Sequence, residues 1–270
     1  MGSIQSITTQ DGAKILYNRN GHQCIAFTHL VEGRGIQANQ FLLIDENHAA
    51  LIDPGGDLTY TPLSIELSKR VNISELDYIF ASHQDPDIIA SLPRWMMHSK
   101  CHVVTSRLWS RFLPHLASTF VTNKFGDDLD DRIISVPDEG MSVSFGRSTI
   151  EAVPAHFLHS VGNFQFYDPV SKILFTGDMG ASLIDDNADL PVEDFDQHIP
   201  HMKSFHQRYM ASNKACRIWV NRARKLDIEM IAPQHGSPFV GKEMVARFFD
   251  WISQLRCGVD LMDENGFYRA

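Results

Sequence analysis

The sequence predicts an α/β fold in which two β-sheets pack face to face with helices on their outer sides, an αββα sandwich. Short β-branched and apolar runs come in two batches, and each batch is closed by stretches with apolar residues at helical spacing. No Gly/Ser/Pro-rich linker and no repeat divides the 270 residues, of which 43% are hydrophobic. We therefore predict one domain over residues 1–270.

Polar or glycine-bearing breaks separate the apolar runs, which is typical of short strands. The strands expected in the first batch cover residues 13–18, 24–30, 40–45, 49–53 and 76–82, with a helix over 58–70. Those expected in the second batch cover residues 149–155, 162–168, 172–178 and 229–233. Further helices are expected over residues 88–97, 196–226 and 241–256. The turn-like residues 138–146 should mark the passage between the sheets.

Charge and composition argue against several classes of protein. The chain has 24 basic and 33 acidic residues and no Lys/Arg-rich run, which disfavours nucleic acid as a partner. It has no run of eighteen apolar residues and no signal-peptide pattern at its start, so we expect a cytoplasmic protein with no membrane partner. Its four cysteines form no C-x-x-C pair, which argues against a disulfide framework or a thiolate zinc site.

Thirteen histidines are a high number for this length, and histidine is the commonest metal ligand. His83, Asp85 and Asp87 follow directly after the apolar run YIFA. Sites in α/β sheets gather outside the carboxyl ends of strands, so these side chains are candidate ligands. An aspartate at a helix start is also a common cap, and this segment alone fits both readings equally well.

Three later segments also place a histidine or aspartate just after a strand-like run, beside glycine or proline. IEAVPAHFLHSVGN carries His156 and His159, KILFTGDMG carries Asp178, and EMIAPQHGSP carries His235. Glycine permits the tight backbone that lets several ligands approach one point. Spacing alone does not choose between His156 and His159. A set of imidazoles and carboxylates without thiolate suits iron or manganese better than zinc.

The ordered set of motifs resembles the metallo-β-lactamase superfamily, from QFLLIDENHAALIDPGG to PQHGSP. The first motif, HQDPDI, has a carboxylate where zinc hydrolases of that superfamily carry a histidine. In this it resembles flavodiiron proteins, although Asp85 is shorter than their glutamate. The strings HFLHSVGNFQFYDP, ILFTGDMGAS and FHQRYMASNKACRIW are similar to the free-standing oxygen-binding di-iron relatives, which lack a flavodoxin domain. The resemblance implies two mixed sheets flanked by helices.

The resemblance also implies a ligand set and a cofactor. The first metal would take His83, Asp85 and His159, the second Asp87 and His235, and Asp178 would bridge them, with His156 outside the ligand set. The cofactor implied is two iron ions joined by an oxo or hydroxo bridge. No flavin is expected, because no phosphate-cradling glycine loop occurs and little chain follows His235.

Ile88 stands where the superfamily motif has a histidine. An isoleucine cannot coordinate, so we expect an open position on the second metal, where an exogenous ligand would enter. The alternative is that His198, His201 or His206 completes that metal. The acidic loop with Asp185, Asp186, Asn187 and Asp189 is expected to be solvated, with a cover over the site as the alternative.

Three functions are compatible with these residues. The first is a di-iron protein that binds O2, or NO, and reduces O2 to bound peroxide as an oxygen sensor or carrier. The second is an O2 or NO reductase supplied by an external electron donor, and the third is a dinuclear metal hydrolase. A signalling or electron-donor protein and a second copy of the chain are the expected protein partners.

Overall fold

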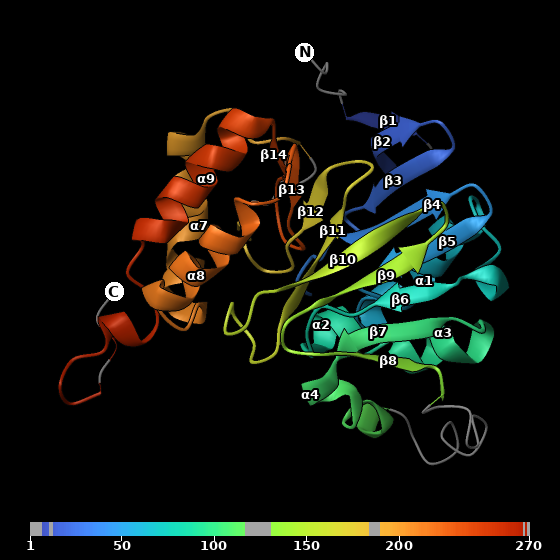
Figure 1. Cartoon of the computed structure of the whole chain (residues 1–270), viewed down its shortest axis with the longest axis horizontal. Helices are drawn as coiled ribbons and strands as arrows, with labels where there is room; N and C mark the ends of the chain where they lie inside the picture. Colours follow the sequence, from blue (N-terminus) through green and yellow to red (C-terminus); the bar gives the residue numbers. More distant parts are fainter. Residues whose placement is uncertain (1–6, 11–12, 117–130, 184–189, 267, 269–270) are drawn as a thin grey trace.

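We analysed a computed structural model that describes residues 7–10, 13–116, 131–183, 190–266 and 268. Two mixed β-sheets lie face to face between two groups of helices (Figure 1). The predicted αββα sandwich is therefore confirmed. None of the described helices combines the length and the apolar character needed to cross a membrane.

The first sheet has 8 strands in the order of the sequence. They are β1 (Thr8–Gln10), β2 (Ala13–Arg19), β3 (His22–Phe27), β4 (Gln40–Asp45), β5 (His48–Ile52), β6 (Tyr78–Phe80), β7 (His102–Ser106) and β8 (Ile133–Val136). Strands β1 to β5 pair antiparallel, whereas β5 to β8 pair parallel. Parallel pairing needs crossover connections, and the chain supplies these between β5 and β8.

The second sheet has 6 strands in the order β14-β13-β12-β11-β10-β9. They are β9 (Met141–Phe145), β10 (Ser148–Pro154), β11 (Phe164–Asp168), β12 (Ile173–Phe175), β13 (Met230–Ala232) and β14 (Phe239–Val240). Only β12 and β13 pair parallel among these neighbours. The strand ends form two opposite edges of the sandwich. Pro154 pairs with Phe164 at one of these edges, and Asp168 pairs with Ile173 at the other. Each edge carries one of the two polar sites described below.

The helices cover the outer faces of the sheets. On the first sheet lie α1 (Asp57–Ser68), α2 (Pro86–Ile89) and α3 (Leu92–His98), with α4 (Arg107–Ser110) after β7. On the second sheet lie α7 (Phe195–Tyr209), α8 (Asn213–Ala223) and α9 (Lys242–Gln254). Short 3-10 turns are η1 (Ile73–Glu75), η2 (Leu113–Leu116) and η3 (Val259–Leu261).

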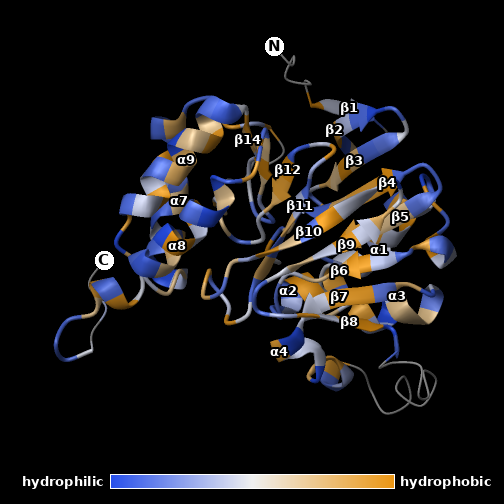
Figure 2. Cartoon of the chain, viewed as in Figure 1, coloured by the Kyte–Doolittle hydropathy of each residue, from blue (hydrophilic) through white to orange (hydrophobic). Residues whose placement is uncertain are grey.

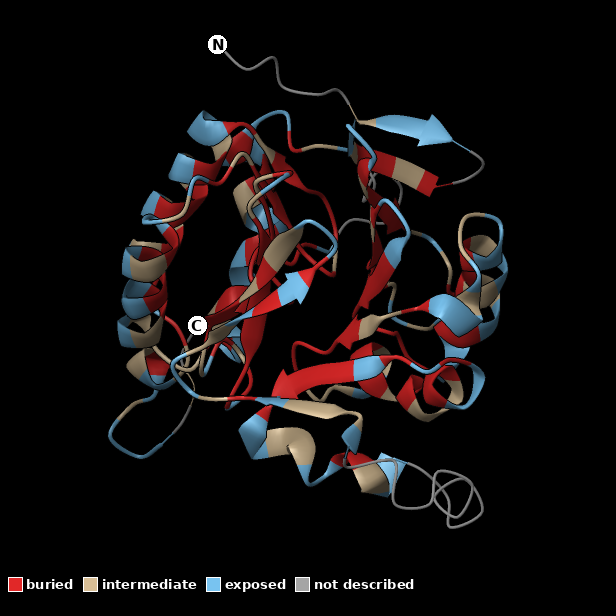
Figure 3. Ribbon diagram, turned by 45° about the vertical axis from the view of Figure 1, so that its right-hand side comes forward, coloured by how far each residue is buried: buried red, intermediate tan, exposed pale blue. Residues whose placement is uncertain are grey.

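Apolar side chains form three clusters that match the four layers. One fills the space between the sheets, with Phe80 of β6 and Phe166 of β11 in ring contact at 5.0 Å. The other two lie between each sheet and its helices, around Trp95 on the first sheet and Trp219 on the second. Hydropathy and burial follow the same division, since most strands are apolar and buried, apart from exposed β1, while the outer helix faces are polar and exposed (Figures 2 and 3). This packing fixes the strand ends, and so positions the loops that follow them.

The structure differs from several sequence predictions about elements. The helix expected over 88–97 is two short helices, α2 and α3, which are separated at Ala90 and Ser91. The stretch expected as one helix over 196–226 is two helices, because Ser212 caps the start of α8 with its side chain. Residues 138–146 include strand β9, although the passage between the sheets does lie there. Strands β7 and β8 were not predicted, and they extend the parallel part of the first sheet.

Candidate metal centre

Four loops meet at one edge of the sandwich, and each follows the carboxyl end of a strand. His83 follows β6, His159 lies between β10 and β11, Asp178 follows β12, and His235 follows β13. The segments are far apart in sequence and come from both sheets. The fold thus brings together side chains that share only their position after a strand end.

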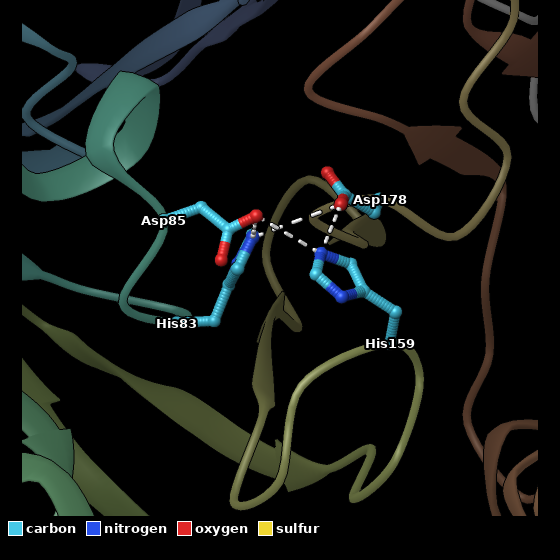
Figure 4. Close-up of side chains that lie close together, drawn as sticks. All are labelled: His83, Asp85, His159 and Asp178. Carbon is cyan, nitrogen blue, oxygen red and sulfur yellow. Dashed lines mark ion pairs between the residues drawn. The ribbon is translucent and has the colours of Figure 1, made fainter. Parts of the chain in front are cut away.

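The first group of side chains contains His83, Asp85, His159 and Asp178, whose donor atoms all lie within 4.8 Å of one another (Figure 4). Asp178 Oδ2 is 2.8 Å from His159 Nε2 and 3.7 Å from His83 Nε2. Asp85 Oδ2 is 3.2 Å from His159 Nε2 and 3.9 Å from His83 Nε2. Two imidazoles and two carboxylates therefore converge on one point.

The second group contains Asp87 and His235, and Asp178 joins it to the first. His235 Nε2 lies 3.6 Å from Asp87 Oδ2 and 3.3 Å from Asp178 Oδ1. Asp178 thus turns one oxygen toward each group. This is the arrangement that a carboxylate bridging two metal ions requires.

Asp85 and Asp87 sit at the start of α2, with Asp85 at the cap position and Asp87 in the first helical turn. Asp85 occupies the cap position, yet its side chain makes no capping hydrogen bond. Its carboxylate points instead toward His159 and His83 (Figure 4). Capping therefore does not explain this aspartate.

A second layer of hydrogen bonds orients the imidazoles. His83 Nδ1 is 2.9 Å from the Ser82 hydroxyl, and His235 Nδ1 is 2.6 Å from the Gln37 carbonyl oxygen. Donation from Nδ1 to a carbonyl leaves Nε2 with its lone pair free, which is the form that binds a metal. Behind them, buried Asp53 accepts hydrogen bonds from the Ser82 amide and from the Gln234 side chain.

Charges in the site favour a cation. Burial by itself lowers the pKa of His159, but hydrogen bonds and charges from Asp178 and Asp85 raise it to about 10. Burial likewise opposes the charge on His235, whose pKa Asp178 and its neighbours raise to about 9. Burial would raise the pKa of Asp178, yet His159 and His235 hold it well below its usual range. Without a metal, His159 and His235 are therefore protonated, and their positive charges lie where the carboxylates would favour a metal ion.

Two buried polar atoms test whether a metal fits. His83 Nε2 and Asp178 Oδ1 are buried and make no hydrogen bond within the described part of the chain. A buried polar atom without a partner is costly, and both atoms point into the constellation. His83 Nε2 belongs to the first group and Asp178 Oδ1 faces the second group, so each atom would gain a bond to a different metal ion. The residues present therefore fit two metal ions.

Comparison with known proteins agrees with this geometry. The model of the family described as ODP family beta lactamase matches residues 36–236. The chain belongs to this family. A solved structure of the peroxy diiron species of chemotaxis sensor ODP is 38% identical and has a TM-score of 0.79, and the match covers 91% of this chain and 97% of that one. The apo state of chemotaxis sensor ODP from T. denticola is 37% identical, with a TM-score of 0.78 and coverage of 92% and 96%.

In more distant relatives, the region matched by this chain is a smaller share of the relative's own length. An uncharacterized protein of Methanocaldococcus jannaschii is 24% identical over 80% of this chain, which spans about half, 53%, of that curated relative. The rubredoxin oxygen:oxidoreductase of Desulfovibrio gigas is 15% identical, with a TM-score of 0.70, and the match covers 89% of this chain and 61% of that one. That likeness shows the fold alone.

The structure of this ODP family protein separates the other candidate histidines from the metal centre. His156 Nε2 lies 2.8 Å from the Asp138 carbonyl oxygen, so His159 rather than His156 joins the constellation. His206 uses both ring nitrogens, since Nδ1 is 2.9 Å from Met202 O and Nε2 accepts from the Gly180 amide at 3.0 Å. It therefore holds the loop that carries Asp178 and is not free to bind a metal.

His198 and His201 belong to neither group of potential metal ligands found among the described residues. His198 packs edge-on against the ring of Phe239, with centroids 5.6 Å apart. Its burial and nearby His201 lower its pKa to about 4. The acidic residues Asp185, Asp186, Asn187 and Asp189 lie outside the described part of the chain.

Ile88, beside Asp87 in α2, is fully buried in this ODP family chain. Its carbonyl oxygen accepts a hydrogen bond from the Gly55 amide at 2.8 Å. The three apolar clusters of the described residues do not include its side chain, whereas Ile89 belongs to the cluster on the first sheet. A polar side chain at this position would therefore be buried.

Two contacts of the site were not predicted from the sequence. The Ser160 hydroxyl donates to Gln84 Oε1 at 2.5 Å, which links the loop of His159 to that of His83. The ring of Tyr209, at the end of α7, stands edge-on to His159 with centroids 5.5 Å apart. Ser160 and Gln84 are neighbours of predicted ligands in the sequence, and Tyr209 is a neighbour of one only in the folded chain. Neither contact could be predicted without the fold.

Proposed function

We propose that this chain is a non-haem di-iron protein that binds O2 as a sensor or carrier. The proposed ligands are His83, Asp85 and His159 for the first iron, Asp87 and His235 for the second, and Asp178 as the bridge. The observation that carries the proposal is the placement of Asp178, whose two oxygens face different groups of ligands. When bound, a diferrous pair supplies the two electrons that reduce O2 to peroxide.

The donor set favours iron over zinc. The constellation offers imidazole and carboxylate but no thiolate among the described residues, and Asp85 adds an oxygen donor to the first group. Oxygen donors suit iron, whereas zinc sites are rich in nitrogen and sulfur. The likeness at 38% identity to a chemotaxis sensor described as a peroxy diiron species supports the same ion and ligand.

The chain's own residues prepare the site for such a ligand. His83 and Asp178 are buried and keep bulk water from the centre, while the side chains of Asp85 and Asp87 are about one-third exposed, so the centre is accessible from their side. Ile88, which cannot coordinate, directly follows Asp87, a proposed ligand of the second iron. An incoming diatomic molecule would therefore bind where few waters compete.

Anaerobic loading with Fe²⁺ followed by exposure to ¹⁶O2 or ¹⁸O2 tests the proposal. We expect two irons per chain and an oxygen-isotope-sensitive O–O stretch in the resonance Raman spectrum. Steady-state O2 and NO consumption with an artificial electron donor separates a sensor or carrier from a reductase, and we expect slow turnover. Zinc at two per chain after growth in balanced metals, or no isotope-sensitive band in the iron-loaded protein, would refute the proposal.

A further inference from the structure

A second cluster of potential ligands lies at the opposite edge of the sandwich. His22 and Cys24 alternate on β3, so both point between the sheets, where Asp168 at the end of β11 meets them. The fractional exposure of these residues is 1% for His22 and 0% for Cys24 and Asp168. Asp168 pairs with Ile173 at this edge, while the His159 loop leaves from the other edge after Pro154. The cluster is therefore separate from the proposed iron centre.

Three donor atoms of different kinds converge there. His22 Nε2 is 2.8 Å from Asp168 Oδ2, Cys24 Sγ is 3.4 Å from that oxygen, and Cys24 Sγ is 3.9 Å from His22 Nε2. A triangle of these dimensions has a centre roughly 2 Å from each corner, close to Zn–N and Zn–O bonds of about 2.0–2.2 Å and to Zn–S bonds of about 2.3 Å. A zinc ion would need only small adjustments of the donors.

The outer contacts resemble those of a metal-bound histidine. His22 Nδ1 is buried without a hydrogen bond in the described structure, and Asp45 Oδ1 lies 3.5 Å from it. Metal-ligating histidines commonly turn their second nitrogen toward a carboxylate in this way. Asp45 itself pairs with Arg147 at 2.7 Å, so it adds no net charge to the cluster.

The proton balance permits an exchange with a divalent cation. Burial opposes a charged His22, but the hydrogen bond and charge of Asp168 and the charge of Asp45 raise its pKa overall. The metal-free cluster is then an imidazolium, a carboxylate and a thiol, with no net charge. Replacing the His22 proton and the Cys24 thiol proton by Zn²⁺ releases two protons and again leaves no net charge. A buried site strongly favours such neutrality.

We infer that His22, Cys24 and Asp168 form a closed zinc site that joins the two sheets, apart from the iron pair. The Ser171 hydroxyl donates to the same oxygen of Asp168, so it is close enough to become the fourth ligand of the zinc ion. Structural zinc sites are closed and usually four-coordinate. The sequence argued against thiolate zinc because its cysteines form no C-x-x-C pair, but here the partners of Cys24 come from a neighbouring position and from another sheet.

Metal analysis with matched variants tests the inference without relying on the iron centre. The chain is studied with Asp178→Ala, which should empty the proposed iron centre, alone and combined with Cys24→Ala or the control Cys101→Ala. Cys101 is likewise buried and contacts Ser99 rather than a histidine. After incubation with Zn²⁺ and gel filtration, we expect about one zinc per chain for Asp178→Ala and for the Cys101→Ala combination. We expect at least a tenfold lower zinc content with Cys24→Ala.

Cobalt substitution of the unaltered chain gives a second measurement that needs no variant. We expect Co²⁺ bound by Cys24 to produce a near-ultraviolet thiolate-to-cobalt charge-transfer band. The band would report on this site, because no cysteine adjoins the iron centre among the described residues. Equal zinc content in the Cys24→Ala and Cys101→Ala proteins, or a cobalt-loaded chain without a thiolate band, would overturn the zinc site and leave a hydrogen-bonded cluster. The di-iron proposal is unaffected by either result, since it concerns the other edge.

Discussion

The backbone amide of Gly180 donates a hydrogen bond to Nε2 of His206, and these atoms are 3.0 Å apart. Gly180 follows Asp178 by two residues, so a buried histidine on α7 fixes the loop that carries the proposed bridging carboxylate. The other ring nitrogen of His206 lies 2.9 Å from the Met202 carbonyl oxygen. His206 is thus a positioning residue in the neutral form, with Nδ1 donating and Nε2 accepting.

Replacing His206 by leucine should therefore affect both stability and metal retention. The variant leaves the Gly180 amide buried without a partner, which costs about 1–3 kcal/mol of unfolding free energy. Loss of an outer-layer contact typically weakens metal binding roughly 10–100-fold. Urea unfolding and iron release to a chelator measure the two effects. His201→Leu, at an exposed position of the same helix, is the control, and equal iron release from both variants would exclude the positioning role.

Asp178→Ala should lose metal more completely than any other single ligand change. A bridging carboxylate serves both ions and offsets their mutual repulsion, whereas Asp85 and Asp87 each face one group of ligands. Iron analysis after anaerobic loading should show nearly none in Asp178→Ala and about one per chain in Asp87→Ala. Asp250→Ala, which alters an exposed pair with Arg224, is the control. Two irons retained in Asp178→Ala would disprove bridging.

Local patterns predicted the layers of the fold and the segments that meet at the edge, whereas the choice of His159 over His156 came only from the family resemblance. Apolar runs alternate with turns, and the candidate ligands follow strand ends in each motif. It did not predict the break before α8, since helical spacing continues through residues 210–212 and only the cap at Ser212 ends the pattern. The division of residues into one domain and the metal-ligand roles stay predictions.

Contacts between segments that are distant in the sequence could not be predicted, for a physical reason. His206 and Gly180, or Ser160 and Gln84, share no local pattern, because a hydrogen bond between distant segments depends on how the sheets pack. The same is true of His22 and Cys24, whose partner Asp168 is 144 residues beyond Cys24 along the chain. Motif spacing finds donors on one loop, but it does not find donors that packing brings together.

Acid should destabilise the protein in part through His198, and His206, whose pKa burial also lowers to about 4, acts in the same direction. Burial, and then His201, lower the pKa of His198 to about 4 in the folded chain, against an ordinary value of 6.5. The unfolded chain therefore binds the proton more readily, so this stabilisation is complete above about pH 6.5 and is lost as pH falls toward 4. Between pH 7 and 5 the loss should be about 2 kcal/mol.

Urea unfolding of His198→Leu at pH 7 and pH 5 checks this sign. The variant has no titrating group at the position, so its unfolding free energy should fall less than that of the unaltered chain over the same interval. His201→Gln, which keeps the buried histidine, should retain a pH dependence close to the original one. A His198→Leu protein with an undiminished pH dependence would show that the acid sensitivity arises elsewhere.

Ile88→His tests the predicted open position on the second metal. A histidine in this place adjoins Asp87 in α2 and should supply the ligand that the superfamily motif contains, which would fill the position and weaken azide binding at least tenfold. Because Ile88 is fully buried, a polar ring there should also cost about 1–3 kcal/mol of unfolding free energy in the metal-free protein. Ile88→Val removes one methylene, costs about 0.5–1.5 kcal/mol and adds no ligand. Azide titration of the three iron-loaded proteins should therefore leave Ile88→Val like the unaltered chain and set Ile88→His apart. Unchanged azide affinity in a folded Ile88→His protein that holds two irons would mean that exogenous ligands enter elsewhere.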